Sequence, residues 1–127
     1  VVLDAMDNWR ARFTVNKGCV EEDVPFVHAG ILGLYGQLTT IVPGKGPCLR
    51  CILPETPEDI PRFPVPGATP AFFATLQVME ALKLILGIGK TLTGRMLVFD
   101  GEYMEFTVIN VEKRPECPIC SRPLKRI

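Results

Sequence analysis

The chain has 127 residues, 47% of them hydrophobic, and its 14 basic and 14 acidic side chains leave no formal net charge. A chain of this length suits one domain, here 1–127, and buries about two thirds of its unfolded surface without needing a metal ion for bulk stability. The charge balance argues against nucleic acid or an anionic membrane as a partner. No uninterrupted apolar run of 18 residues is present, so the composition favours a soluble protein.

Apolar runs separated by turn residues predict alternating strands and helices. In chain order the expected elements are a strand at 1–3, a helix at 8–22, strands at 25–31 and 37–42, a proline-rich crossover, a helix at 70–86, and a hairpin of strands at 95–101 and 102–111. The first helix places Trp9, Phe13 and Val20 on one face, and the first hairpin region is interrupted by the glycine-rich run GILGLYG. Because the chain opens directly on an apolar strand that runs into an acidic loop, we expect a fragment of a longer protein.

The helix at 70–86 has the clearest boundary signals. We expect Thr69 as its N-cap, Pro70 at its first position and Gly87 just beyond its end. Its inner stripe is expected to be Phe73, Leu76, Met79, Leu82 and Leu86.

The crossover before this helix contains the segment ETPEDIPRFPVPGATP. Its prolines cannot donate backbone hydrogen bonds to a sheet, and its charged side chains keep it solvated. We therefore expect residues 55–65 to lack regular structure and to be mobile when no partner is bound.

The strongest chemical signal is two C-x-x-C segments, Cys48 with Cys51 and Cys117 with Cys120, separated by 65 residues. Each such turn sets two sulfurs on one side of the backbone, and four thiolates complete the tetrahedral shell of a structural zinc ion. Closing a loop of this length costs on the order of 4 kcal/mol, whereas zinc binding to four thiolates contributes roughly 10–16 kcal/mol. We therefore expect Zn²⁺ on these four cysteines as a structural clip.

Two disulfides, four free thiols or an iron site of the rubredoxin type are the other arrangements open to these cysteines. Two disulfides would leave Cys19 unpaired, and the sequence has no secretory signal, which favours reduced thiols and a cytoplasmic location. Cys19 itself is expected to pack in the core as a small apolar residue. His28, the single histidine, is expected to be a hydrogen-bonded core residue rather than a catalytic base.

Several segments together resemble the HesA/MoeB/ThiF family, relatives of the ubiquitin-activating enzymes, over the full length of the chain. Its most specific parts are the two cysteine pairs in family order and a D-x-x-D-N-x-x-x-R-x-x-x-N run formed by Asp4, Asp7, Asn8, Arg12 and Asn16. The resemblance implies an α/β fold, the C-terminal half of a Rossmann-like ThiF/MoeB-type fold, with a mixed sheet, flanking helices and a structural zinc site. It also implies a homodimer that uses ATP and Mg²⁺ to adenylate the C-terminal glycine of a ubiquitin-like sulfur-carrier protein.

The resemblance further implies individual roles. Asp7 corresponds to the family's magnesium-binding aspartate, which makes it the implied catalytic residue and, with Asn8 and Arg12, part of the implied cofactor-binding set. A carboxylate at the C-terminal edge of a strand suits magnesium that bridges phosphates, while Asp7 and Asn8 could also simply cap the following helix. Arg12 and Asn16 share a helix face that lies near the nucleotide site in the family. The segment beside which the carrier's extended tail lies corresponds to Gly30, Gly33, Gly36 and Gln37.

Two features of the family are absent from the chain. The glycine-rich nucleotide loop belongs before Val1, and the crossover cysteine of many members has no counterpart in Asp59–Thr69. We therefore expect no adenylation by this chain alone, and adenylation without a covalent enzyme–carrier bond in its parent. A noncatalytic, zinc-clipped dimerisation or interaction module, which would need the cysteines but not Asp7, remains the alternative.

Overall fold

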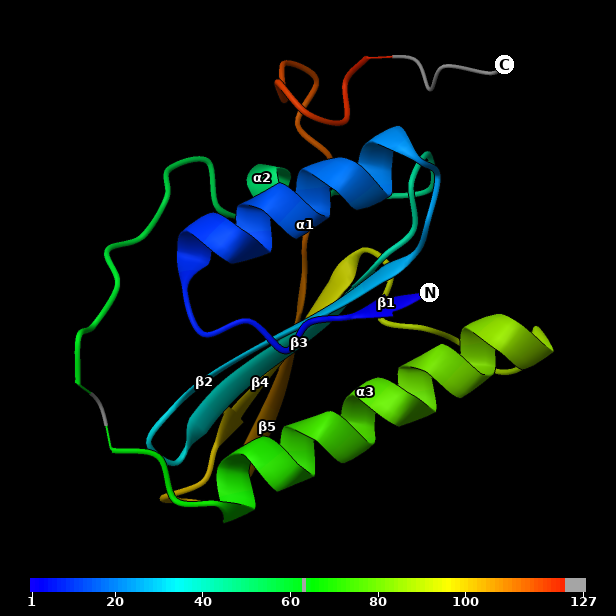
Figure 1. Ribbon diagram of the computed structural model, residues 1–127. Coiled ribbons are helices and arrows are strands. Elements are labelled where there is room, and N and C mark those ends of the chain that lie inside the picture. The colour runs from blue at the N-terminus through cyan, green and yellow to red at the C-terminus, as the bar shows by residue number, and fades with distance from the viewer. Residues whose placement is uncertain (63, 123–127) are drawn as a thin grey trace.

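The computed structural model describes residues 1–62 and 64–122 and consists of a mixed sheet with flanking helices (Figure 1). The strands are β1 (Val2–Leu3), β2 (Phe26–Leu32), β3 (Tyr35–Ile41), β4 (Arg95–Asp100) and β5 (Glu105–Asn110), in this order across the sheet. β1 and β2 run parallel, and each later pair of neighbours is antiparallel. The expected α/β fold with a mixed sheet is confirmed.

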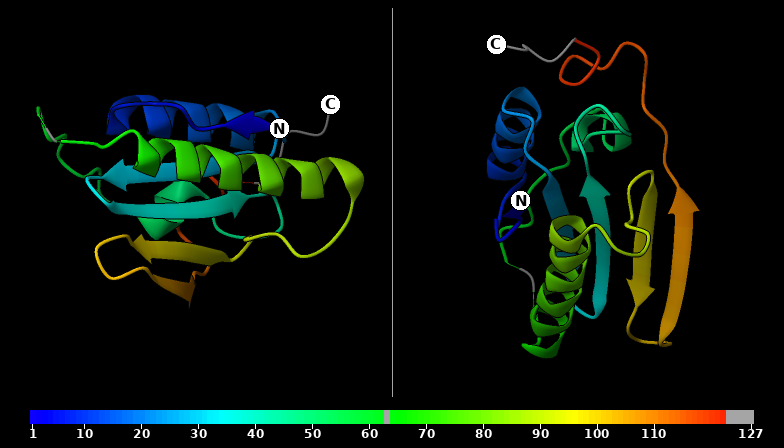
Figure 2. Two further views of the ribbon diagram at one scale, coloured as in Figure 1. Left: turned by 90° about the horizontal axis from the view of Figure 1, so that it is seen from below. Right: turned by 90° about the vertical axis from the view of Figure 1, so that its right-hand side faces the viewer.

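The two long helices, α1 (Trp9–Glu21) and α3 (Ala68–Leu86), cover opposite faces of this sheet. α1 packs against Phe26 and Ile41, whereas α3 packs against Val27 and Leu38. Adjacent residues of β2 therefore enter different cores, as expected for a strand whose side chains alternate between faces. In Figure 2 the β4–β5 hairpin lies at the side of the sheet farthest from β1.

α1 agrees with the prediction. Its N-cap is Asn8, whose side-chain oxygen accepts the backbone N–H of Ala11 at 2.8 Å. Phe13 and Val20 are buried on its inner face, and Trp9 packs partly buried against the same core. The predicted burial of Cys19 in this core is confirmed as well. The single-turn helix α2 (Leu49–Ile52), which the sequence did not predict, packs beside α1.

The glycine-rich run was predicted to separate the two strands, but most of it lies within them. Gly30 lies within β2 and Gly36 within β3, and the hairpin turn is confined to Gly33 and Leu34, with φ of +59° at Gly33. A Cβ atom at Gly36 would overlap the ring of Phe73, so glycine is what lets α3 approach β3 here.

The predicted start of α3 is wrong, while its predicted end is confirmed. The helix begins at Ala68 after Gly67, so Thr69 and Pro70 lie inside it rather than at the N-cap and first position. The Thr69 hydroxyl instead donates to the backbone oxygen of Gly33 at 2.7 Å. Gly87 ends the helix in the left-handed conformation, with φ of 64°.

The predicted inner stripe of α3 is also largely wrong. Of the stripe residues, Phe73 is buried and Leu76 partly buried, but Met79, Leu82 and Leu86 are exposed. The buried positions of the helix are Thr69, Phe73, Gln77, Glu80 and Ala81.

Two polar side chains on the buried side of α3, Gln77 and Glu80, bond to backbone groups of other segments. Gln77 Nε2 donates to the backbone oxygens of Asp4 and Val27 at 2.9 and 3.0 Å. A carboxylate oxygen of Glu80 accepts the backbone N–H of Leu92 at 2.8 Å. Without these bonds the buried side chains of Gln77 and Glu80 would be left unpaired, at a cost of about 1–3 kcal/mol each.

By length and apolar composition, α3 is the one helix within residues 1–62 and 64–122 that could cross a membrane. The core helix of a soluble protein passes the same test. One such helix is weak evidence for a membrane span, and α3 packs on the sheet with buried polar groups such as Gln77.

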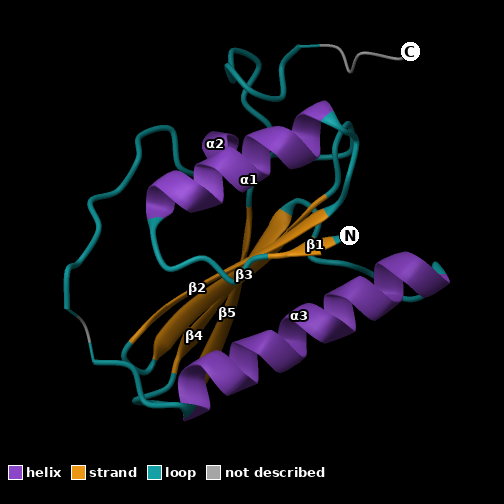
Figure 3. Cartoon of the chain, in the orientation of Figure 1, coloured by secondary structure: helices purple, strands orange, loops and turns teal. Residues whose placement is uncertain are grey.

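The remaining expectations concern the loops and the last hairpin. β4 and β5 form the predicted hairpin. The crossover from Leu53 to Gly67, leaving aside position 63, contains neither helix nor strand (Figure 3). Its mobility stays a prediction.

Candidate functional site

The four cysteines expected to bind metal converge between α2 and the turns after β5. Cys48 immediately precedes α2 and Cys51 lies within it, while Cys117 and Cys120 belong to the C-terminal turns. The Sγ atoms of Cys48 and Cys117 are 3.7 Å apart, those of Cys51 and Cys120 are 3.3 Å apart, and all four lie within 4.8 Å of one another. Tetrahedral metal–sulfur bonds of about 2.3 Å would place sulfurs about 3.8 Å apart, so one metal ion fits this cluster.

Burial and hydrogen bonds shift the pKa of three of these thiols. Burial raises the pKa of Cys48 and of Cys120. Burial acts the same way on Cys117, but backbone N–H groups of Cys120 and Ile119 donate toward its sulfur and bring its pKa down to about 7. A bound cation would stabilise the thiolate form of all four.

Asn16, which the resemblance implies to lie near the nucleotide site, contacts the helix that carries Cys51. It is fully buried, and its Oδ1 accepts the backbone N–H of Leu49 at 2.9 Å. Asn16 therefore anchors the first turn of α2, the helix that carries Cys51.

A cleft of about 380 Å³ lies near the N-terminal end of α1. Asp7 and Arg12 line it, together with Gly30 and Gln37 from the β2–β3 hairpin and Asp59 from the crossover. Gly36 also borders it, whereas Gly33 does not. The cleft opens where β1 ends beside its parallel neighbour β2, the usual ligand-binding edge of an α/β sheet.

Asn8 connects the helix cap to this cleft. While its Oδ1 caps α1, its Nδ2 donates to Asp7 Oδ1 at 2.9 Å. Asp7 is exposed, and its Oδ2 has no hydrogen bond or ion pair with any residue that the structure describes. Asn8 thus caps α1 and also orients the Asp7 carboxylate, one oxygen of which stays available to a ligand.

Arg12 is held on three sides and leaves one nitrogen toward the cleft. Its guanidinium lies 4.8 Å from the centre of the Trp9 ring, and its Nη2 donates to the backbone oxygen of Met6 at 3.0 Å. Its Nε is 3.3 Å from Asp4 Oδ2, close enough for an ion pair but not aligned as a hydrogen bond. Nη1 has no hydrogen bond within the described part of the chain and lies 3.5 Å from where a Cβ at Gly30 would stand.

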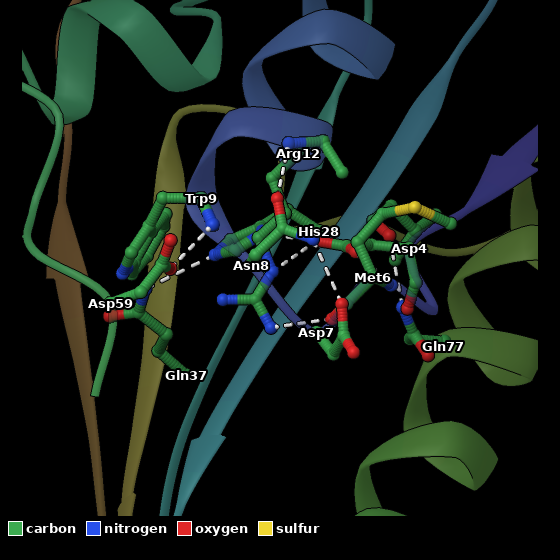
Figure 4. A network of polar contacts seen from close by, with 12 residues as sticks. Asp4, Met6, Asp7, Asn8, Trp9, Arg12, His28, Gln37, Asp59 and Gln77 are labelled. Atoms are coloured by element: carbon green, nitrogen blue, oxygen red, sulfur yellow. Dashed lines mark hydrogen bonds and ion pairs between the residues drawn. The ribbon is translucent and has the colours of Figure 1, made fainter. Parts of the chain in front are cut away.

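Asp4 is the residue that sequence reasoning missed as the centre of this network (Figure 4). Its carboxylate is buried and lies 2.7 Å from His28 Nδ1, while its other oxygen accepts the backbone N–H of Met6 at 2.9 Å. His28 Nε2 in turn lies 3.1 Å from Gln37 Nε2. His28 is therefore the hydrogen-bonded core residue that was predicted. The pairing of Leu3 with Val27 places Asp4 beside His28, a long-range register that no local pattern reveals.

Burial lowers the pKa of His28, against the opposing effect of its hydrogen bond to Asp4. The imidazole is therefore neutral at neutral pH. Asp59 completes the site from the crossover, because its carboxylate accepts the backbone N–H of Trp9 at 2.9 Å, at the positive end of the α1 dipole.

A family model and two curated relatives both connect this chain with the same family of enzymes. A family model described as "ThiF family" matches residues 1–119. The SAMP-activating enzyme E1 of Haloferax volcanii is 41% identical over 125 residues, which cover 94% of this chain and 46% of that protein. The adenylyltransferase and sulfurtransferase MOCS3-1 of Drosophila pseudoobscura pseudoobscura is 41% identical over 127 residues, 95% of this chain and 28% of that protein. The chain thus spans less than half the length of either relative.

Two solved structures of E. coli MccB share the fold. The complex with ATP has a TM-score of 0.78 at 19% identity, and the complex with AMPCPP and MccA has a TM-score of 0.80 at 18% identity. Each match covers 94% of this chain and 39% of the MccB chain. At this identity the likeness concerns the fold.

Proposed function

Because the chain belongs to the ThiF family, we propose that it forms the second half of a cytoplasmic, ATP-dependent enzyme that adenylates the C-terminal glycine of a ubiquitin-like sulfur-carrier protein. The observation that carries this proposal is the cleft, which is lined by both Asp7 and Arg12, each with an atom free of hydrogen bonds within the described residues, and by glycines of the β2–β3 hairpin. The names of the two relatives, an activating enzyme and an adenylyltransferase, support the same activity.

The proposed reaction joins the carrier's terminal carboxylate to the α-phosphorus of ATP and releases diphosphate. Asp7, oriented by Asn8, would hold Mg²⁺, which offsets the negative charge of the phosphates when it is bound. Arg12 Nη1 would donate to a phosphate oxygen, because its other nitrogens are already engaged within the protein. The remaining phosphate contacts would come from a glycine-rich loop outside these 127 residues.

For the four-cysteine cluster we propose a structural Zn²⁺ ion. Four buried sulfurs at near-tetrahedral spacing form a closed donor set, which is typical of structural zinc and leaves no position for a substrate. An iron-thiolate centre would use the same ligands, but it would be coloured, so visible absorbance and elemental analysis of the purified protein separate the two.

A noncatalytic zinc-clipped module is the second candidate. It explains the cysteine cluster but gives no reason for an oriented, available carboxylate at Asp7 beside a fixed guanidinium at Arg12. We also propose a homodimer, supported by the exposed apolar side chains of α3, among them Met79, Leu82 and Ile85, which a second copy could cover. Light scattering on the full enzyme tests the dimer.

ATP–diphosphate exchange tests the enzyme proposal directly. In the enzyme that contains this chain, with a panel of ubiquitin-like carriers, Asp7→Asn should lower exchange by about 100-fold or more, the usual effect of losing one positioned electrostatic group. Asp23→Asn is the matched control, because Asp23 is an exposed acid at the other end of α1 with φ of 57°, which asparagine tolerates. The isolated chain should give background exchange.

Unchanged exchange in the Asp7→Asn enzyme would refute the site assignment. A zinc-loaded wild-type enzyme that shows no exchange with any carrier would favour the interaction module instead.

A further inference from the structure

Behind the cleft lies a buried group that the proposed reaction does not use, the imidazole of His28. The ring is fully buried, and each of its nitrogens has one side-chain partner, Asp4 on one side and Gln37 on the other. Asp4 lies inside the protein, whereas Gln37 borders the cleft. The three side chains therefore form a polar chain that runs from the interior to the ligand-binding surface (Figure 4).

The contacts of Asp4 determine which nitrogen of His28 carries the proton. Arg12 Nε lies 3.3 Å from Asp4 Oδ2, and Met6 donates its N–H to Oδ1, so both oxygens of Asp4 face donors. His28 Nδ1 must then donate to Asp4, which leaves Nε2 of the neutral ring as an acceptor. Gln37 consequently turns its Nε2–H toward His28, and its Oε1 points away from the ring.

Gly30 lies beside the Gln37 amide. In the β2–β3 register Gln37 is opposite Gly30, and His28 is opposite Thr39, so the Gln37–His28 contact is diagonal. A Cβ at Gly30 would lie 3.4 Å from Gln37 Nε2 and 3.5 Å from Arg12 Nη1, which means that the amide lies across the bare backbone of Gly30. No described residue donates a hydrogen bond to Gln37 Oε1.

We propose that Gln37 is a specificity residue of the cleft and that Asp4 and His28 are positioning residues that orient its amide. Gln37 Oε1 accepts a backbone N–H of an extended peptide that lies over Gly30, between Gln37 and Arg12. This inference rests on the proposed function, because the peptide is then the glycine-ending tail of the carrier. It goes beyond that function by naming Gln37 Oε1 as the atom that binds the tail, and Asp4 and His28 as the buried pair that orients the Gln37 amide.

The orientation is tested first by ¹⁵N NMR on the wild-type chain at neutral pH, which needs neither a variant nor catalysis. The expected result is a protonated Nδ1 and an unprotonated Nε2 on His28, with one side-chain N–H of Gln37 in a hydrogen bond to that nitrogen. A protonated Nε2 on the neutral ring would reverse the Gln37 amide and overturn the proposal.

Recognition is tested by titrating the chain with a short peptide that ends in glycine and with versions N-methylated at one residue at a time. One methylated version should bind about tenfold more weakly to the wild-type chain, because it lacks the N–H that Gln37 accepts. Gln37→Leu should bind that version and the parent peptide equally, and His28→Leu should do the same, while His28→Gln, which keeps an acceptor near Gln37, should partly restore the difference.

Equal binding of every methylated peptide to the wild-type chain, or no binding of the parent peptide, would overturn the proposal. Neither measurement depends on adenylation. Absent diphosphate exchange would therefore refute the proposed function while these results still decide how Gln37 is oriented and what it binds.

Discussion

Replacing Gly36 with alanine should destabilise the protein, because the new methyl group would overlap the ring of Phe73. Phe73 is 1% exposed, and the centres of the Phe72 and Phe99 rings lie 5.5 and 6.2 Å from the centre of its ring. A shift of the Phe73 ring would therefore displace packed neighbours. Overpacking of this kind costs about 1–3 kcal/mol, and the better strand preference of alanine returns about 0.5–1 kcal/mol. The expected net loss in unfolding free energy is about 0–2.5 kcal/mol.

Urea unfolding of the chain with saturating zinc measures this loss. Gly30→Ala is the matched control, since its methyl group would meet Gln37 and Arg12 at the ordinary contact distances of 3.4 and 3.5 Å and should raise stability by about 0.5–1 kcal/mol. Adding Phe73→Leu to Gly36→Ala should recover part of the loss, with a coupling energy of about 0.5–3 kcal/mol. A Gly36→Ala protein as stable as the Gly30→Ala control, or additive effects with Phe73→Leu, would refute the packing argument.

Three further predictions follow from the metal cluster, the buried histidine and the crossover. Cys117→Ser should loosen the turns after β5 without unfolding the sheet, so that increased hydrogen exchange stays confined to that region; global exchange would contradict zinc as a clip. Since burial lowers the pKa of His28 below 6.5, the unfolded chain binds more protons just below that pH. Stability should therefore fall as the pH drops through this window, by up to about 1.4 kcal/mol per pH unit, and the slope from urea melts should flatten in His28→Gln. Proteases should cut residues 55–65 first, and faster in Asp59→Ala, which loses the bond to Trp9; first cleavage within α3 would contradict the fold.

The features that could be predicted from sequence follow local rules. The spacing within each cysteine pair, the Asn8 cap and the left-handed Gly87 each depend on a few neighbouring residues. The β4–β5 hairpin likewise follows from two apolar strands around a turn at Gly101. Such patterns can be recognised in the sequence because they do not depend on the rest of the chain.

The rotation of α3 could not be predicted in this way. A helix with apolar side chains on most of its surface does not reveal which face is buried, and the buried face found here bonds to backbone groups far away in the sequence. Gln77 donates hydrogen bonds to the backbone oxygens of Asp4 and Val27, and Glu80 accepts one from the backbone N–H of Leu92. Met79 and Leu82 are exposed as a consequence.

By itself the sequence determined which four cysteines come together, the α/β class and the segment that carries Asp7, because C-x-x-C turns, helix caps and strand periodicity are short-range properties. Only the tertiary structure decided that Asn16 supports the cysteine cluster and that Asp4, His28 and Gln37 form one polar chain. The physical reason is that these contacts depend on strand register and on which buried polar atoms lack a partner. Both are settled only when residues far apart in the chain pack together.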